Sequence, residues 1–321
     1  MRRFCLITTV KDEGPSIVEW VAHHLNIGFT DIVIYENDSS DDTRKLLRTM
    51  NRLGFITFFP NPDKNKSWQN KAYRRASRLN AYKDADWAMA LDGDEYLVVK
   101  VGDGKVADLV DAVPDGINCI QVNWKLFGSS FRKKTSDALV TEDFIWAEDS
   151  ARISQKLIGF KSIFKPSVFK RTGIHRPKDI FRGQTENTCN GSGIRAGQFN
   201  EKLWRSADQG LRKLAQVNHY IIRDAQRFII KSDRGRTSNK HRHVALEYWL
   251  EYELHDEIDR TLLDKSPETR ARIAQMNSAS KNRLNILTEL ALQHQNTRFD
   301  LLMLNPQYKL LFEQITGSVK I

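Results

Sequence analysis

Apolar and polar residues alternate in a regular order along the first hundred residues. Short runs rich in β-branched and aromatic side chains predict strands at residues 3–10, 30–37, 55–60 and 86–92. Between these runs, apolar residues recur every three or four positions, which predicts helices within residues 14–28, 38–54 and 70–85. Each of the first three strands is thus followed by a helix.

This repeated strand–helix–strand order favours right-handed crossovers and a parallel sheet with helices on both faces. In such sheets, ligands bind beside the carboxyl ends of the strands. Three polar, acidic loops should meet at that edge: residues 11–14 after the first strand, 36–42 after the second and 92–95 after the fourth. The sequence therefore predicts a functional site at this edge of the sheet.

Beyond Gly104 the alternation is less regular. Further strands are predicted within residues 117–128, 160–170 and 215–223. Helical spacing returns at 224–234 and 241–295, and the residues expected on one helix face there are Leu246, Trp249, Leu250 and Leu254. The prediction is an α/β fold with a mostly parallel sheet flanked by helices and a C-terminal helical extension.

Composition narrows the class of protein. The 321 residues are 40% hydrophobic and 28% charged, which is typical of a globular protein with a large core. No apolar run reaches the roughly 18 residues of a membrane span, and the apolar run near the N-terminus is too short for a signal peptide. Cys5, Cys119 and Cys189 are widely spaced, which favours a reducing, cytoplasmic environment.

The formal net charge of +10 favours an anionic partner, such as a phosphorylated substrate, a membrane surface or nucleic acid. A soluble basic surface is an equally good explanation of the charge alone. A nucleic-acid-binding protein would show a basic stripe interleaved with aromatic residues. Here the basic residues are spread over both halves and the strand-end loops are acidic, so nucleic acid is not the expected partner.

The turn after the fourth strand carries Asp92, Gly93, Asp94 and Glu95. Two carboxylates on a loop suit Mg²⁺ or Mn²⁺, because these cations prefer oxygen ligands and keep positions open for phosphate and water. The alternative is an ordinary acidic surface turn. Its position after an apolar strand, at the predicted edge, favours a metal site.

The other two loops can serve a nucleotide. Residues 9–14, from Thr9 through Lys11 and Glu13, form either a charged turn or a contact to phosphate and ribose. Asp38 lies at the end of the second strand, where acids also complement the start of a helix. Its carboxylate can accept hydrogen bonds from a sugar hydroxyl or a base.

These segments together resemble the start of family-2-like glycosyltransferases with the GT-A fold. The quoted elements are "TTVKDEG", "NDSSDDT" and "WAMALDGDEYL", and the last is similar to a metal-binding D-x-D element in its D-x-D-E-Y/F form. Residues 123–130 and 217–235 resemble later segments of one bacterial subgroup. The resemblance extends over roughly residues 4–236.

The resemblance implies a metal-dependent transferase that moves a sugar from a nucleotide-sugar, most simply a UDP-sugar, to a hydroxyl of a glycan, polysaccharide or lipid-linked sugar. It implies a domain at 1–236, with a nucleotide-binding half at 1–104 and an acceptor half at 105–236. The helical segment at 237–321 would pack on this domain, mediate dimerisation or lie on an anionic membrane surface, and its aromatic residues favour packing.

Carried over by position, the resemblance implies that Asp38 contacts the nucleoside. Asp92 and Asp94 would hold Mn²⁺ or Mg²⁺ or the ribose, with Asp94 as the direct ligand. His219 would complete the metal shell, and His175 is the alternative histidine.

A basic stretch at 223–243 offers Arg227, Lys231 and Arg234 as contacts to the diphosphate, although a solvated amphipathic helix explains the same pattern. A second basic stretch at 70–78 is better explained as a helix surface.

Inverting transfer needs a general base for the acceptor hydroxyl. The candidates are Glu142, Asp143, Glu148 and Asp149. Glu142 and Asp143 precede aromatic residues whose burial would raise a carboxyl pKa. Glu95 would orient its neighbours or lie near the acceptor.

The alternative enzyme class is a nucleotidyltransferase or another Mg-dependent phosphotransfer enzyme. The sequence has no Gly-rich loop of the kind that commonly grips a triphosphate. A phosphatase with an aspartate nucleophile would carry its acids on the first strand rather than the fourth.

Overall fold

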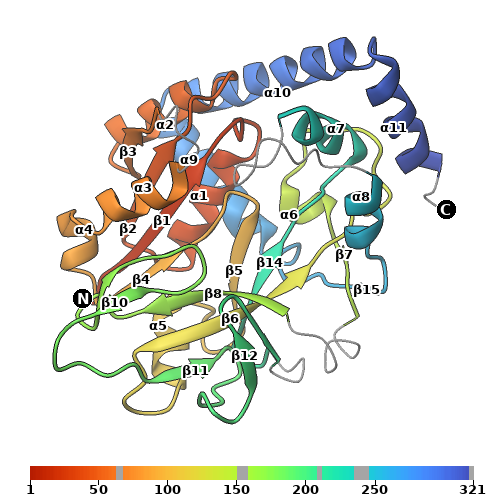
Figure 1. Ribbon diagram of the computed structural model, residues 1–321. Coiled ribbons are helices and arrows are strands. Elements are labelled where there is room, and N and C mark those ends of the chain that lie inside the picture. The colour runs from red at the N-terminus through yellow and green to blue at the C-terminus, as the bar shows by residue number, and fades with distance from the viewer. Residues whose placement is uncertain (63–67, 150–157, 208–211, 235–245, 318–321) are drawn as a thin grey trace.

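Strands and helices alternate from the N-terminus, as the sequence predicts (Figure 1). The structure is a computed structural model that describes residues 1–62, 68–149, 158–207, 212–234 and 246–317. The elements up to the fourth strand are β1 (Phe4–Val10), α1 (Ile17–Asn26), β2 (Asp31–Glu36), α2 (Thr43–Arg52), β3 (Thr57–Pro60), α3 (Trp68–Ala76), α4 (Asn80–Lys83) and β4 (Trp87–Ala90). The predicted alternation and the parallel pairing of these strands are confirmed, and the stretch 70–85 contains parts of two short helices instead of one helix.

The rest of the sheet comes from the middle of the chain. Its elements are β5 (Glu95–Val99), α5 (Val106–Ala112), β6 (Cys119–Leu126), α6 (Val140–Asp143), β7 (Trp146–Ala147), β8 (Ile158–Phe164), β9 (Phe169–Arg171), β10 (Lys178–Ile180), β11 (Thr188–Asn190), β12 (Asn200–Lys202), β13 (Arg205–Ala207) and β14 (Ala215–His219). The main strand order is β3-β2-β1-β4-β8-β6-β14-β5. The first four strands run parallel, whereas β8 is antiparallel to both of its neighbours in this order. The α/β fold class is confirmed.

The acidic turn connects the middle of the sheet to its far edge. The chain leaves β4, turns through residues 91–94 and continues as β5, which pairs antiparallel with β14. The sequence patterns do not predict β5, and all five of its residues are buried. In the pairing register His219 at the end of β14 lies opposite Glu95, so the turn and the end of β14 are neighbours.

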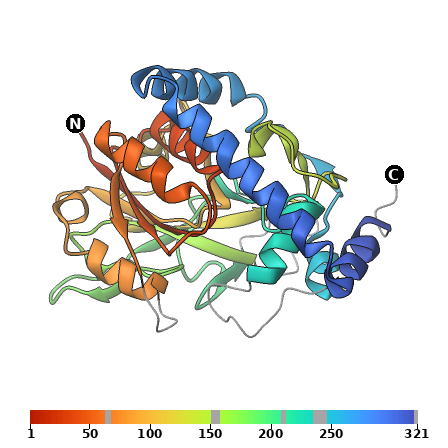
Figure 2. The ribbon, with the colours of Figure 1, turned by 90° about the horizontal axis from the view of Figure 1, so that it is seen from above.

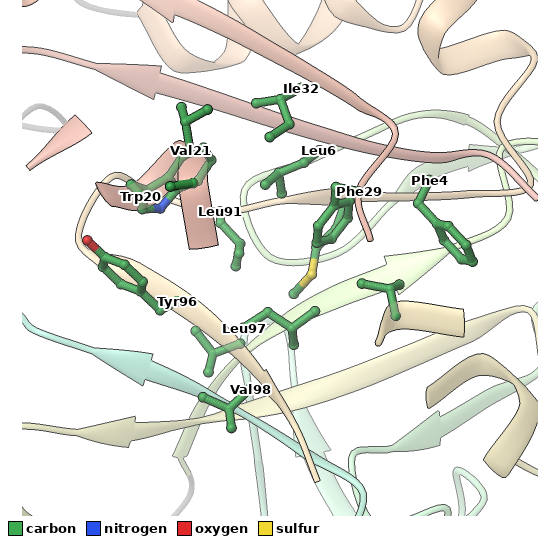
Figure 3. Close-up of a cluster of buried hydrophobic side chains, with 14 of the residues drawn as sticks. Phe4, Leu6, Trp20, Val21, Phe29, Ile32, Leu91, Tyr96, Leu97 and Val98 are labelled. Atoms are coloured by element: carbon green, nitrogen blue, oxygen red, sulfur yellow. The ribbon is translucent and has the colours of Figure 1, made fainter. Parts of the chain in front are cut away.

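A buried hydrophobic cluster holds the turn from beneath (Figure 3). Trp20 of α1, Leu6 of β1 and Leu97 of β5 are fully buried in it, and complete burial of such a side chain contributes about 1.5–3 kcal/mol. The Trp20 indole also donates a hydrogen bond of 2.8 Å to the carbonyl of Glu95. Core packing therefore fixes the last residue of the acidic turn.

The C-terminal part is helical and packs on the sheet domain. Its elements and the preceding helix are α7 (Ala225–Arg234), α8 (Leu246–Tyr252), β15 (Glu257–Ile258), α9 (Ser266–Ala279), α10 (Arg283–Leu302) and α11 (Pro306–Gly317). α9 contacts α1, and α10 contacts both α2 and α7. Figure 2 shows α10 crossing the top of the molecule between these two helices. None of the described helices combines the length and the apolar composition needed to cross a membrane.

Two expectations about this part are wrong in detail. Residues 241–295 do not form continuous helix in the described region, because turns and β15 separate α8 from α9. Leu250 does not share a buried face with Trp249, since Leu250 is 54% exposed while Trp249 is fully buried. Trp249 packs edge-on against Phe228 of α7, and α8 also contacts α11.

Candidate active site

The acidic turn is closed by its own hydrogen bonds. The amide of Asp92 donates to the Glu95 carboxylate at 2.8 Å, and the amide of Glu95 donates to the carbonyl of Asp92 at 3.1 Å. The side chains of Asp92 and Asp94 leave this turn toward different partners. The turn therefore has a sheet side, comprising Asp92 and Glu95, and a cavity side, which carries Asp94.

On the sheet side, a buried lysine neutralises the carboxylates. Lys161 of β8 is fully buried, and its ammonium lies 2.8 Å from Asp92 and 3.1 Å from Glu95. Gln69 donates to the other Asp92 oxygen at 2.7 Å. Burial opposes the charge on Lys161, but Asp92 and Glu95 outweigh it and raise the lysine pKa. Burial also raises the pKa of Glu95 to about 7.

On the cavity side, Asp94 faces a histidine and a lysine. Its two oxygens lie 3.7 Å from Nε2 of His219 and 3.3 Å from Nζ of Lys231. Burial opposes ionisation of Asp94, but Lys231, His219 and Arg223 outweigh it and hold the pKa of Asp94 well below its usual range. Nδ1 of His219 is buried without a hydrogen-bond partner, and the ring packs on Trp124 with centroids 4.6 Å apart.

A cavity of about 50 Å³ opens beside Asp94. Its charged lining residues are Asp12, Glu13, Asp94, Arg223, Arg227, Lys231 and Arg234. Cations thus outnumber carboxylates in the lining, which favours an anionic ligand. The volume is smaller than a nucleotide-sugar, so only the charged groups of such a ligand would reach into it.

Arg223 joins two of the predicted loops. Its guanidinium donates to Glu13 at 3.0 Å and to the carbonyl of Gly93 at 3.2 Å. It follows β14 in a left-handed conformation with φ of 56°, and its side chain is buried. Sequence reasoning missed Arg223 as a site residue, although it begins the basic stretch. Its position is set by the pairing of β14, which the local pattern does not reveal.

The three basic residues predicted for the diphosphate all line this cavity. Lys231 donates to the carbonyl of Ile221 at 2.6 Å as well as contacting Asp94, and burial lowers its pKa. Burial and the neighbouring Arg223 lower the pKa of Arg227. Arg234 donates to the carbonyl of Lys11. α7 therefore aligns these residues along one wall of the cavity.

The first two loops contribute unequally to the site. Glu13 lines the cavity, whereas the Lys11 ammonium lies 5.2 Å from the ring of Trp68. Thr9 is partly buried in β1. Asp38 is largely exposed and pairs with Arg44 at 3.1 Å.

Sequence reasoning also missed a buried amide pair beside the second loop. Asn61 donates to Asn37 at 2.6 Å at the carboxyl ends of β3 and β2. Asn37 begins the quoted element "NDSSDDT", but local sequence does not reveal its contact with Asn61, because the pairing of β2 with β3 brings the two together.

Most candidate bases are held by arginines. Arg270 donates to Glu142 at 2.7 Å and lowers its pKa. Arg212 and the amide of Leu126 bind Glu148. The amide of Asp149 donates to Asp256 at 3.2 Å.

Asp143 is the candidate base whose pKa is influenced by a residue of the cavity lining, Arg227. It is bound by Arg132 and by Ser136, the latter at 2.5 Å. Burial raises the pKa of Asp143, with Arg132 and the cavity residue Arg227 acting against the rise.

His175, the alternative metal ligand, is engaged elsewhere. Its Nδ1 lies 3.0 Å from the carbonyl of Phe160, and burial lowers its pKa to about 4. It is therefore neutral at pH 7.

Within the described residues, no three His, Cys, Asp or Glu side chains gather closely enough to hold a metal. Asp92 is engaged by Lys161 and Gln69, which leaves Asp94 and His219 as a facing oxygen–nitrogen pair. Mg²⁺ is often bound by only one or two protein groups, with phosphate oxygens and water completing the shell. Nε2 of buried His219 and the ionised carboxylate of Asp94 face each other across 3.7 Å, and this pair fits a two-ligand site of this kind.

Helix α10 closes the cavity from the C-terminal part. Gln295 lines it and donates to the carbonyl of Asp12 at 3.1 Å. A Cβ at Gly14 would lie 2.5 Å from Cβ of Ala291, so this glycine permits the close approach of α10. The sequence predicts helix here, but not its contact with the site.

Comparison with known protein families gives one match. The model described as glycosyltransferase family 92 matches residues 4–234. A search of curated protein sequences finds no match.

Solved structures match at low identity. S. aureus TarS 1-349 in complex with UDP is 13% identical, with 52% of this chain and 47% of that chain covered and a TM-score of 0.33. Glucosyl-3-phosphoglycerate synthase from Mycobacterium tuberculosis, in complex with Mn²⁺, UDP and glucosyl-3-phosphoglycerate, is 10% identical, with 52% and 58% covered and a TM-score of 0.30. The chain thus spans about half the length of these two proteins.

Proposed function

Since the chain belongs to glycosyltransferase family 92, we propose that it moves a sugar from a nucleotide-diphosphate sugar to a hydroxyl group of an acceptor. Family membership makes the protein a glycosyltransferase; the donor, the cation and the stereochemistry are the proposal. The observation that carries it is the cation-rich cavity beside Asp94, where loops from both halves of the sheet meet.

The leaving group in this reaction is a nucleoside diphosphate that gains negative charge. Arg223, Arg227, Lys231 and Arg234 line the cavity and supply fixed positive charge where that diphosphate would lie. Such groups accelerate transfer only as far as they bind the departing diphosphate more strongly than the intact donor. The nucleoside would extend along the first two loops, past Thr9, Lys11 and Glu13 toward Asp38, and UDP is the proposed nucleotide.

Asp94 and His219 would hold Mn²⁺ or Mg²⁺. When bound, the cation would supply Lewis-acid neutralisation of the leaving diphosphate. Asp94 remains ionised, because Lys231 and His219 favour its charge. Asp92 is held by Lys161, so its proposed role is to orient the turn, with the exposed part of its carboxylate left to contact ribose.

Asp143 is the proposed general base for an inverting transfer. A carboxylate whose pKa is raised by burial accepts a proton more readily than an ordinary one. The acceptor hydroxyl would pass its proton to Asp143 as its oxygen attacks the anomeric carbon. Glu142 is fully paired with Arg270, which favours a structural role for it. Glu95 would act by holding Lys161 and the turn in place.

The proposed acceptor is a glycan, a polysaccharide or a lipid-linked sugar, the last reached at the inner membrane surface. Thermal-shift measurements with UDP, GDP and CDP, each with and without Mn²⁺, test the donor site. We expect Mn²⁺-dependent stabilisation that is largest with UDP. Absence of such stabilisation with every nucleotide would contradict the proposal. Mass spectrometry of nucleotide-sugar hydrolysis would then identify the sugar.

A further inference from the structure

Three aromatic rings meet where residues 131 and 146 of the sheet domain pack against residue 255 of the C-terminal part. Phe131 stacks on His255 with centroids 3.8 Å apart and an interplanar angle of 16°. Trp146 of β7 lies edge-on to both rings, with centroids 5.8 Å from Phe131 and 6.1 Å from His255. Phe131 is nevertheless 38% exposed. We call Phe131, Trp146 and His255 the aromatic platform.

The loop that presents Phe131 is conformationally strained. Ser130 and Phe131 have φ of 52° and 61°, a left-handed region that bulky residues rarely adopt. The loop is held there by hydrogen bonds: Phe131 donates its amide to Ser129 Oγ at 3.1 Å, and Ser130 Oγ accepts from the amides of Ile145 and Trp146. The strained loop packs one part of the Phe131 ring on His255 and Trp146 and leaves another part in solvent. Such strain is typical of functional sites.

Backbone hydrogen bonds tie the platform loop to the cavity. Phe127 donates to the carbonyl of His219 at 3.1 Å, at the start of the loop. At its other end, Ala225 at the start of α7 donates to the carbonyl of Arg132 at 3.1 Å. α7 carries Arg227 and Lys231 of the cavity wall. The platform thus shares its supporting elements with the candidate active site.

The same loop reaches the proposed base. Arg132 directly follows Phe131 and binds Asp143. Glu253 holds Ser129 on the other side of the loop, accepting from its hydroxyl at 2.6 Å and from its amide at 3.0 Å. Aromatic faces and hydrogen-bonding side chains therefore stand next to each other, as recognition of a sugar requires.

We propose that the aromatic platform binds a pyranose ring of the acceptor, with the C–H face of the sugar on the rings and its hydroxyls toward the polar groups around Asp143. This inference rests on the proposed function and adds the acceptor subsite to it. The electron-rich faces of aromatic rings attract the polarised C–H groups of a sugar. Stacking of this kind orders a sugar without a deep pocket, which suits an exposed surface.

Saturation-transfer NMR with a panel of methyl glycosides tests the proposal directly. The panel comprises the methyl α- and β-pyranosides of glucose, galactose, mannose and N-acetylglucosamine, without any donor. We expect saturable binding of at least one glycoside to the wild-type protein. Phe131→Gly should weaken it at least tenfold, and Phe131→Tyr should retain it. Glycine suits the left-handed position, so Phe131→Gly is expected to fold with a Tm close to that of the wild type.

Phe181→Ala is the matched control, because Phe181 is also an exposed phenylalanine, at 43%, and is not part of the platform. It should bind the glycoside as the wild type does. The proposal is overturned if no glycoside binds, or if Phe131→Gly binds as tightly as the wild type. UDP binding with Mn²⁺ is measured on the same samples. If Phe131→Gly loses glycoside binding but still binds UDP, the platform is supported. If the wild type binds a glycoside but not UDP, only the proposed donor site is contradicted.

Discussion

The two sides of the acidic turn differ in what neutralises their carboxylates. On the sheet side, Asp92 and Glu95 surround the ammonium of Lys161, which is fully buried. On the cavity side, Asp94 meets His219 and Lys231 at the wall of a cavity rich in cations.

The difference shows that one short motif can serve two purposes. The sheet side is a closed ionic cluster whose partners come from the protein itself, so its role is to fix the turn. The cavity side keeps a carboxylate and a histidine facing each other at 3.7 Å, without a hydrogen bond between them. We propose that this is the side that receives the cation and the phosphate.

The largest expected effect is on the sheet side. Lys161→Met should lower the free energy of unfolding by about 3–5 kcal/mol, because it leaves the buried Glu95 carboxylate without its cation and takes the ammonium away from the partly exposed Asp92. Lys170→Met is the control, since Lys170 is exposed on β9, and it should change stability by less than about 0.5 kcal/mol. Urea unfolding measures both. Equal stability of the two variants would show that Lys161 does not hold the turn.

Activity should depend instead on the cavity side. Asp94→Asn should reduce sugar transfer by roughly 100-fold to 1000-fold, the size of effect seen when one charge-stabilising group is removed from an active site. Its Tm should stay within a few degrees of the wild type. Initial rates with a saturating nucleotide-sugar measure the effect. A variant that transfers sugar at the wild-type rate would remove Asp94 from the site.

The two sides should also respond oppositely to pH. Glu95 has its pKa raised to about 7 by burial, so the folded protein binds this proton more tightly than the unfolded chain. Stability from Glu95 should therefore fall as pH rises from about 4.5 to 7, by about 3 kcal/mol. Glu95→Gln should remove this dependence of stability on pH.

Asp94 has its pKa held well below the usual value by Lys231 and His219, against the effect of burial. Its contribution to stability should be complete above about pH 4 and be lost on acidification below that. Urea unfolding from pH 3 to 8 compares the wild type with Glu95→Gln and Asp94→Asn. If the contributions of Glu95 and Asp94 to the free energy of unfolding changed with pH in the same direction, the division of the turn into a sheet side and a cavity side would be contradicted.

The smallest effect concerns α10, which lines the cavity through Gln295 and packs against both the first loop and α7. Gly14→Ala should cost about 1–2 kcal/mol of stability, because the added Cβ would meet Ala291. Ala291→Gly should restore most of it in the double variant, which a double-mutant cycle measures. Gly317→Ala, with open space around its Cβ, is the control. If the changes in unfolding free energy caused by Gly14→Ala and Ala291→Gly were simply additive, α10 would not pack against the first loop at this point.

Local patterns predict the first part of the molecule well. Strands β1 to β4 and the helices between them follow from apolar spacing, and the acidic turn follows from its place after β4. The wall of basic residues on α7 was also predicted, because Arg227, Lys231 and Arg234 recur at helical spacing in one stretch.

The missed residues come from pairing over long separations. Lys161 reaches Asp92 from 69 positions away and Gln295 reaches Asp12 from 283 positions away. Such contacts depend on strand order and helix packing, and a local pattern carries no information about either. β5 was missed because its buried residues follow the turn without the alternation typical of a half-buried strand.

The most direct test of the account is calorimetric titration of UDP with and without Mn²⁺ into the wild type, Asp94→Asn and Asp92→Asn. We expect Mn²⁺ to tighten UDP binding to the wild type at least tenfold, Asp94→Asn to lose this gain and Asp92→Asn to keep most of it. An equal gain in Asp94→Asn, or no gain in the wild type, would contradict the assignment of the cavity side as the donor site.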